Sequence, residues 1–201
     1  VTVTTNRFKH YYPYYNEEGE LVANKIRLTD MEGGKSFATN GEWEEATLFG
    51  QNTCRKQGKY ITLCEGELDA LSAYQMMGSK WPVVSIKNGA QGAVRDIKEN
   101  IEYVESFDNV VICFDNDKQG IEASQKVASI IKPRKAKIVS IPNGYKDAND
   151  MLRKGSSHAY TTTWWSAKIY TPSGVVNAED LKDKYFNREK KESVPYPWQG
   201  L

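Results

Sequence analysis

Acidic side chains stand directly after two stretches of this chain that have the composition of buried strands. Glu65 follows the apolar run 60–64, and Asp115 and Asp117 follow the most hydrophobic run, 110–114. Carboxylates held together repel one another unless a cation lies among them, and oxygen ligands without histidine or thiolate select a hard ion. Two Mg²⁺ or Mn²⁺ ions about 4 Å apart can support in-line phosphoryl transfer by activating an attacking hydroxyl and neutralising a leaving group. The pattern therefore predicts a metal site at Glu65, Asp115 and Asp117.

A simpler interpretation is that each acid caps a helix or lies in its first turn, where the helix dipole favours a carboxylate. We favour that interpretation for Glu67, Asp69 and Asp150. We favour a metal for Glu65, Asp115 and Asp117, because separate strand ends seldom all carry bare acids by chance. Asp147, in the polar segment after a further apolar run, is compatible with both interpretations.

Apolar runs that alternate with helical spacing between residues 57 and 155 predict an α/β domain. Strands are expected at 60–64, 82–86, 110–114 and 136–141, and helices at 67–77, 93–107 and 119–131. Continuous apolar strands that alternate with helices are typical of a parallel sheet flanked by helices on both faces. Ligands of such sheets collect at the carboxyl ends of the strands, so Glu65 and Asp115 are expected at one edge.

The first 56 residues have a different pattern, of short strands joined by turns. Strands are expected at 9–15 and 21–28, with turns at 16–19 and 31–34 and a loop or short helix at 41–50. We expect a small, mostly β subdomain over residues 1–56, ahead of an α/β domain over 57–155.

The pattern weakens beyond residue 155. We expect a closing helix at 156–169, in a segment that reaches residue 174, and a charged linker helix at 178–191. Residues 194–201 are aromatic and proline-rich and end without a capping signal. We therefore interpret 175–201 as a linker and the start of a further domain that is cut short.

The composition excludes several classes of protein. The 27 Lys and Arg balance 26 Asp and Glu, for a net charge of +1, so a charged binding surface must come from a local cluster. With 39% hydrophobic and 26% charged residues, the chain suits a folded globule, and no apolar run approaches the roughly 20 residues of a membrane-spanning helix. The three cysteines and two histidines lack the spacing of a disulfide framework or a zinc site. We expect a cytoplasmic protein.

Three segments together resemble the TOPRIM fold. They are LCEGELD at 63–69, VVICFDNDKQG at 110–120 and KDAND at 146–150. The likeness is to the primase half of bifunctional primase-helicases of short-tailed phages and to their mitochondrial helicase relatives. It extends over about residues 10–190 and is strongest between 59 and 153.

The resemblance implies a DNA-dependent RNA polymerase that makes short primers on a single-stranded DNA template from nucleoside triphosphates. In that family the corresponding acids bind the catalytic Mg²⁺ or Mn²⁺ ions. The resemblance therefore assigns the metal to Glu65, Asp115, Asp117 and Asp147.

Basic side chains of the family's β-rich subdomain contact phosphates and template. Lys25 is the first candidate for this role here, with Arg27 and Lys35 behind it. The alternative for all three is ordinary solvated charge on a strand edge. Gly89, in a loop between a strand and a helix, allows backbone amides to approach a phosphate, although a tight turn needs the same glycine.

Full-length members of the family also carry a zinc-binding module and a helicase motor, and they form hexameric rings. The cysteine set of the zinc module is missing from this sequence. Gly33 to Ser36 end like a nucleotide-binding loop, but Thr29 stands where its first glycine belongs, so we expect no ATPase. We expect this fragment to be monomeric alone and to join a ring only within the full-length chain.

Two other functions stay open. A phosphatase of the haloacid-dehalogenase type also places Asp-x-Asp after a hydrophobic strand, but it leaves Glu65 and Gly66 without a role. A non-catalytic scaffold module of a replicative helicase would keep the fold and bind no metal.

Overall fold

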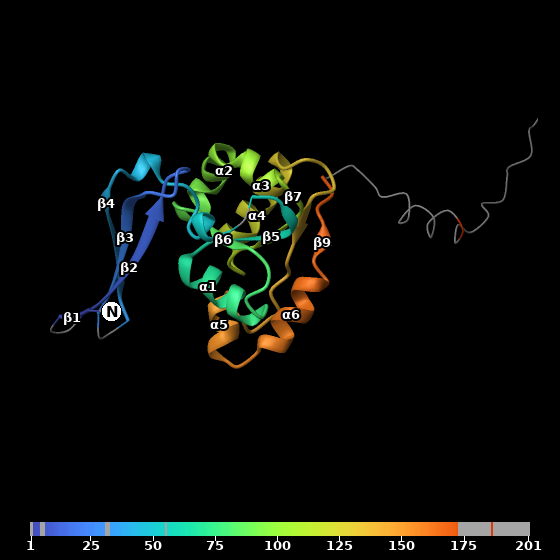
Figure 1. The fold of residues 1–201 in the computed structure, drawn as a ribbon. Helices are drawn as coiled ribbons and strands as arrows, with labels where there is room; N and C mark the ends of the chain where they lie inside the picture. Colours follow the sequence, from blue (N-terminus) through green and yellow to red (C-terminus); the bar gives the residue numbers. More distant parts are fainter. Residues whose placement is uncertain (1, 5–6, 31–32, 55, 173–185, 187–201) are drawn as a thin grey trace, which may run out of the picture. The chain divides into compact units, whose positions relative to one another are not determined.

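The computed structural model describes residues 2–4, 7–30, 33–54, 56–172 and 186, and the chain divides into two units, Val1–Tyr170 and Thr171–Leu201. The first unit carries two sheets (Figure 1). The expected linker helix 178–191, apart from Phe186, and the segment 194–201 lie outside the described residues. Within the described ranges, no helix is long and apolar enough to cross a membrane.

The N-terminal sheet has four antiparallel strands in the order β1-β2-β3-β4. They are β1 Thr2–Thr4, β2 Arg7–Tyr15, β3 Leu21–Asp30 and β4 Lys35–Gly41. The predicted strands at 9–15 and 21–28 correspond to β2 and β3, which turn at Gly19, a residue with φ of +83°. The sequence did not predict β4, because all seven of its residues are exposed and no buried face imposes an alternating pattern.

A small aromatic core joins this sheet to the rest of the unit. The buried Tyr14 ring lies edge-on to Trp43, with the ring centroids 4.7 Å apart, and also packs against Phe49. Trp43 belongs to η1 Trp43–Glu45, a 3-10 helix where the sequence predicted a loop or short helix. Leu68, from the first α-helix, packs on the same cluster. These contacts bring β2 and β3 next to the start of that helix.

The second sheet has five strands in the order β6-β5-β7-β8-β9, and it confirms the predicted α/β class. The strands are β5 Gly58–Cys64, β6 Val83–Ser85, β7 Phe107–Cys113, β8 Ala136–Ile138 and β9 Lys168–Ile169, of which only β9 is antiparallel to its neighbour. The helices are α1 Glu67–Met76, α2 Gly89–Glu99, α3 Ile101–Glu105, α4 Lys118–Ile130, α5 Ala148–Arg153 and α6 Ser157–Trp165, and η2 Gln51–Thr53 precedes β5.

Helices lie on both faces of this sheet, and each face has its own core (Figure 1). Ile61 and Leu63 of β5 point into the core that contains α2, α3 and α4. Cys64, one position further along the same strand, points into the core that contains α1, α5 and α6. Both faces of β5 are therefore apolar, which is why this strand has a continuous apolar run instead of an alternating one.

Two predicted helices differ from the observed ones. The helix expected at 93–107 is interrupted at Asn100, whose φ and ψ of −113° and 22° are not helical and whose side chain donates to the Asp96 carbonyl. The helix expected at 156–169 ends at Trp165, because β9 pairs with β8 instead of continuing the helix.

Candidate metal centre and phosphate groove

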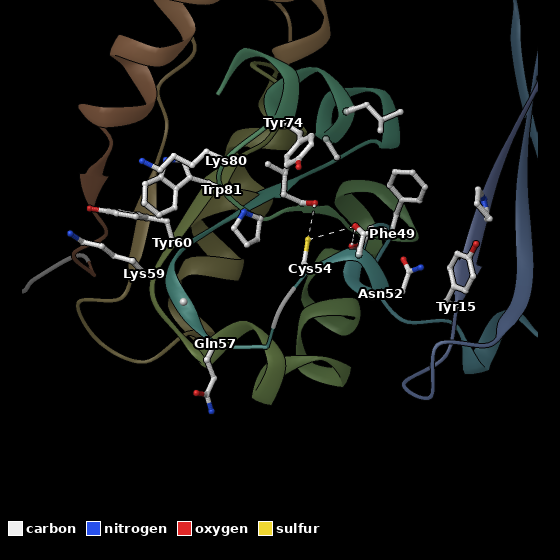
Figure 2. Close-up of a pocket in the computed structure, with 18 residues that line it drawn as sticks. Tyr15, Phe49, Asn52, Cys54, Gln57, Lys59, Tyr60, Tyr74, Lys80 and Trp81 are labelled. Carbon is white, nitrogen blue, oxygen red and sulfur yellow. Dashed lines mark hydrogen bonds between the residues drawn. The ribbon is translucent and has the colours of Figure 1, made fainter. Parts of the chain in front are cut away.

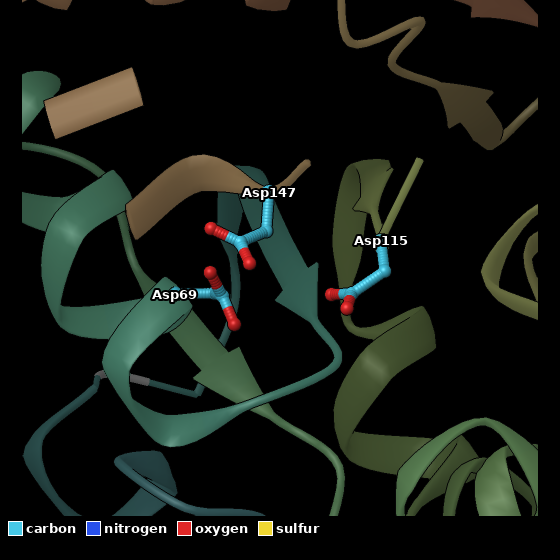
Figure 3. Close-up of side chains that lie close together, drawn as sticks. All are labelled: Asp69, Asp115 and Asp147. Carbon is cyan, nitrogen blue, oxygen red and sulfur yellow. The ribbon is translucent and has the colours of Figure 1, made fainter. Parts of the chain in front are cut away.

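Three carboxylates converge at the carboxyl edge of the five-stranded sheet. Asp115 follows β7, Asp69 lies in the first turn of α1, and Asp147 is the N-cap of α5. Each offers an oxygen, and these atoms all lie within 4.8 Å of one another. Figure 3 shows the three side chains pointing toward a common space from three separate segments.

Hydrogen bonds to backbone amides fix two of these carboxylates. Asp147 Oδ1 accepts from the Asp150 amide at 2.6 Å, the ordinary capping bond of a helix. Asp69 Oδ1 accepts from the Asn149 amide at 3.0 Å, so α5 donates to a residue of α1. Asp147 thus serves both as a helix cap, through Oδ1, and as a member of the cluster, because its other oxygen can bind a cation.

A positive charge would stabilise the ionised carboxylates of this cluster, which are partly buried and repel one another. Burial, and then the charge of Asp147, raises the pKa of Asp69 from 3.8 to about 8. Burial also raises the pKa of Asp115, although Lys146 opposes that shift. The Lys146 ammonium lies 2.9 Å from Asp115 Oδ2 and 3.7 Å from Asp147 Oδ2. Since this side chain is largely exposed, its ammonium can be exchanged for another cation, and the all-oxygen donor set fits a hard metal ion.

Glu65, at the end of β5, provides a further carboxylate for the same groove. Its Oε1 accepts from the Ala90 amide at 3.2 Å, and its Oε2 is buried without a hydrogen-bond partner among the described residues. Burial and the charge of Asp115 raise the pKa of this side chain. A buried carboxylate oxygen without a partner is costly, and a metal ion or its water would satisfy it.

Asp117 is exposed and caps α4, accepting from the Gly120 amide at 2.9 Å. It lies outside the group of three close carboxylates. A Cβ on Gly120 would overlap the Asp115 carbonyl oxygen, so the glycine lets the first turn of α4 approach the Asp-x-Asp segment closely. Metal binding by Asp117 stays a prediction.

Basic side chains of the N-terminal sheet line the other side of the groove. Lys25 Nζ lies 2.7 Å from Glu67 Oε1 and donates to the Lys87 carbonyl at 3.0 Å. Glu67 is buried and also accepts from the Tyr14 hydroxyl at 2.6 Å. Lys25 is therefore a paired, mostly buried charge and not a solvated one. Arg27 also lines the groove, and its buried Nε has no hydrogen-bond partner within the described ranges.

A fully buried acid, Asp96, shapes the loop between β6 and α2. It accepts hydrogen bonds from the Lys87 amide, the Asn88 amide and the Asn88 side chain, at 2.8, 2.8 and 2.7 Å. Gly89 begins α2 with φ of +64°. This loop supplies the Lys87 carbonyl that holds Lys25 and the Ala90 amide that holds Glu65.

The acidic and basic sides form one groove of about 650 Å³. Its lining includes Lys25, Arg27, Lys35, Lys87, Gly89, Glu65, Asp69, Asp115, Lys146 and Asp147. The groove thus combines carboxylates suited to a metal with cations suited to phosphate groups, which is the combination that a nucleotide-handling site requires.

The sequence and the fold of this chain are similar to those of known proteins. Residues 62–152 match the family described as Toprim-like. The DNA helicase/primase of Enterobacteria phage T3 is 33% identical over 179 residues, which cover 89% of this chain and 30% of that protein. The crystal structure of the primase fragment of the bacteriophage T7 primase-helicase protein aligns with a TM-score of 0.69 and 28% identity, over 78% of this chain and 63% of that one. The chain contains a Toprim primase domain.

A second T7 structure aligns with a TM-score of 0.70 and 28% identity, over 81% of this chain and 79% of that one. It contains lagging-strand DNA polymerase interacting with primase domains of two subunits bound to an RNA/DNA hybrid and dTTP. The chain spans less than a third of the length of the phage T3 relative.

The predicted acids of this Toprim domain and the observed cluster overlap only in part. Asp115 and Asp147 belong to both, and Glu65 lines the same groove. Sequence reasoning missed Asp69 and interpreted it as a helix-end charge. Its position four residues after Glu65, in a helix that starts at the sheet edge, was the available signal. Lys87 was missed too, and it is buried with its ammonium donating to the Ala46 carbonyl at 2.6 Å.

Proposed function

We propose that this chain synthesises RNA primers on single-stranded DNA by nucleotidyl transfer with Mg²⁺ or Mn²⁺. The observation that carries the proposal is the facing arrangement of the carboxylates Asp69, Asp115 and Asp147 and the cations Lys25 and Arg27 in one groove. The relatives named DNA helicase/primase and DNA primase support it.

The metal-binding residues in this proposal are Asp69, Asp115 and Asp147, with Glu65 and Asp117 as the further ligands expected for a second ion. When bound, the metal would lower the pKa of a primer 3′-hydroxyl and neutralise the triphosphate. The orphaned Oε2 of Glu65 and the raised pKa values of Asp69 and Asp115 fit this occupant, because a divalent cation would offset the cost of each.

The basic residues position the nucleotide in this proposal. Lys25 is held by Glu67 and the Lys87 carbonyl, so its ammonium is ordered before a substrate enters. The partnerless Nε of Arg27 offers a donor to a phosphate oxygen, and Lys35 adds charge at the groove wall. Gly89 allows the backbone near Glu65 to approach the phosphates.

We further propose that the chain acts as the primase part of a longer phage primase-helicase, with a zinc-binding module, a helicase and a hexameric ring. The alignment to less than a third of a DNA helicase/primase supports this placement. Its site of action would be the cytoplasm of the infected host.

The decisive experiment measures incorporation of labelled ribonucleotides on a single-stranded DNA template with Mg²⁺ or Mn²⁺. We expect Asp69→Asn and Asp115→Asn to lower primer synthesis by roughly a hundredfold or more, since each removes a metal-binding charge. Asp108→Asn, which removes an exposed carboxylate of the strand that Asp115 follows, is the control and should retain activity.

Three outcomes would contradict the proposal. Undiminished synthesis by Asp115→Asn would refute the metal assignment. A folded wild-type chain that binds no Mn²⁺ would favour a scaffold module, in which the Lys146 to Asp115 ion pair replaces the metal. Turnover of an aryl phosphate at the Asp115 carboxylate would favour the phosphatase.

A further inference from the structure

A second groove, of about 720 Å³, lies beside edge strand β6 and shares no lining residue with the carboxylate groove. Figure 2 shows its aromatic lining, which includes Tyr60, Tyr74 and Trp81. The groove meets β5 at its amino end, near Lys59 and Tyr60, whereas Glu65 follows the carboxyl end. At about 3.3 Å per residue, the two sites are separated by roughly 16 Å along the strand. We call this second site, together with Trp165 and Lys137, which adjoin its Tyr60 ring, the β6 groove.

Aromatic rings line the β6 groove, and two of them are exposed. The Tyr60 ring lies 5.2 Å from Trp81 and 5.5 Å from Trp165, in edge-to-face contacts. Trp165 is 53% exposed and Tyr74 is 42% exposed. Large rings are seldom left this open on a surface without a partner, and each offers a flat face for stacking.

Lysines accompany these rings without carboxylate partners. The ammonium groups of Lys59 and Lys137 lie 5.9 and 5.5 Å from the Tyr60 ring centroid, and that of Lys80 lies 5.0 Å from the Trp81 ring. Within the described ranges none of the three forms an ion pair, and the groove lining contains no Asp or Glu. The surface is therefore positively charged and complementary to an anionic partner.

We propose that the β6 groove binds single-stranded DNA, with bases stacked on the rings and phosphates paired with Lys59, Lys80 and Lys137. The proposal rests on the proposed function, which brings a single-stranded template to this chain. Two neighbouring rings, Tyr60 with the ammonium groups of Lys59 and Lys137 and Trp81 with that of Lys80, match the alternating bases and phosphates of a single strand. An acidic peptide would match the charges but would leave the ring faces without equally regular partners.

The experiment measures the anisotropy of a fluorescein-labelled oligo(dT) of 15 nucleotides with the 201-residue chain in EDTA, at several salt concentrations. Each lost phosphate contact lowers the slope of log K against log salt by about 0.7, so the double variant Lys80→Gln, Lys137→Gln should lose about 1.4. The ratio of its affinity to that of the wild type should therefore be about 25-fold lower at 0.1 M salt than at 1 M salt. Trp165→Ala should weaken binding at least about fivefold.

The matched control is Lys98→Gln, Lys126→Gln, which removes the same charge from exposed positions of α2 and α4. It should keep the wild-type slope, and circular dichroism should give both lysine double variants the wild-type melting temperature within a few degrees. An unchanged slope in Lys80→Gln, Lys137→Gln would overturn the inference. Stronger displacement of the label by oligo(U) or by an acidic peptide than by unlabelled oligo(dT) would overturn the assignment to DNA.

The two proposals fail separately. A chain that binds through the β6 groove but makes no primers refutes the proposed function alone. If the chain makes primers and its salt-dependent affinity for oligo(dT) is unchanged in Lys80→Gln, Lys137→Gln, only the DNA-binding role of the β6 groove is refuted.

Discussion

Replacing Asp69 by asparagine should change how the stability of the metal-free protein depends on pH. Burial and the Asp147 charge raise the pKa of Asp69 from 3.8 to about 8 in the folded chain. Between these two values the native state holds a proton on Asp69 that the unfolded state has lost. The free energy of unfolding therefore falls as pH rises through this window.

The magnitude follows from the width of the window. One pKa unit corresponds to about 1.36 kcal/mol, so Asp69 should remove roughly 4 kcal/mol of stability at most between pH 5 and pH 8. Asparagine at position 69 cannot titrate and has nearly the shape of a protonated aspartate. The variant should match the wild type near pH 5 and be the more stable of the two at pH 8.

Urea unfolding in EDTA, followed by circular dichroism at pH 5, 6, 7 and 8, measures this difference directly. Asp108→Asn, which removes an exposed carboxylate of β7, should keep the wild-type pH dependence. Mn²⁺ should stabilise the wild type more at pH 8 than at pH 5, because a metal binds the ionised carboxylates. Parallel pH profiles for wild type and Asp69→Asn would refute the reasoning.

Two further predictions concern the residues that hold the groove in shape. Lys25→Met should destabilise the chain by about 3 kcal/mol in urea unfolding, because it leaves the buried Glu67 carboxylate without its cation; a double variant with Glu67→Gln that recovers none of this loss would contradict the explanation. Asp96→Ala should cost about 3 kcal/mol or more, because Lys87 and Asn88 lose the acceptor of three hydrogen bonds, and Asp96→Asn should cost less. Equal melting temperatures for wild type and Asp96→Ala would show that the loop does not depend on this acid.

Strands with buried faces could be predicted, because burial imposes an apolar pattern on the sequence. Strands that form only by pairing with a neighbouring strand could not. The continuous apolar residues of β5 and β7 follow from burial on both faces of a parallel sheet, so the sequence was sufficient to find both. Strand β4 is exposed at every position, and the two exposed residues of β9 are strand only because β8 lies beside them. Neighbouring strands supply their hydrogen bonds, and no local pattern records that.

The sequence by itself determined the α/β class and the positions of Glu65 and Asp115, because the apolar period is local and a strand end is visible in it. Only the tertiary structure decided that Asp69 belongs with Asp147, since a first-turn acid has a sufficient local explanation as a helix-end charge. The packing of α1 against α5 brings these carboxylates together, with the Asn149 amide bound to Asp69 at 3.0 Å. Charge repulsion and burial depend on distances between segments some 80 residues apart, which the order of residues along the chain does not contain.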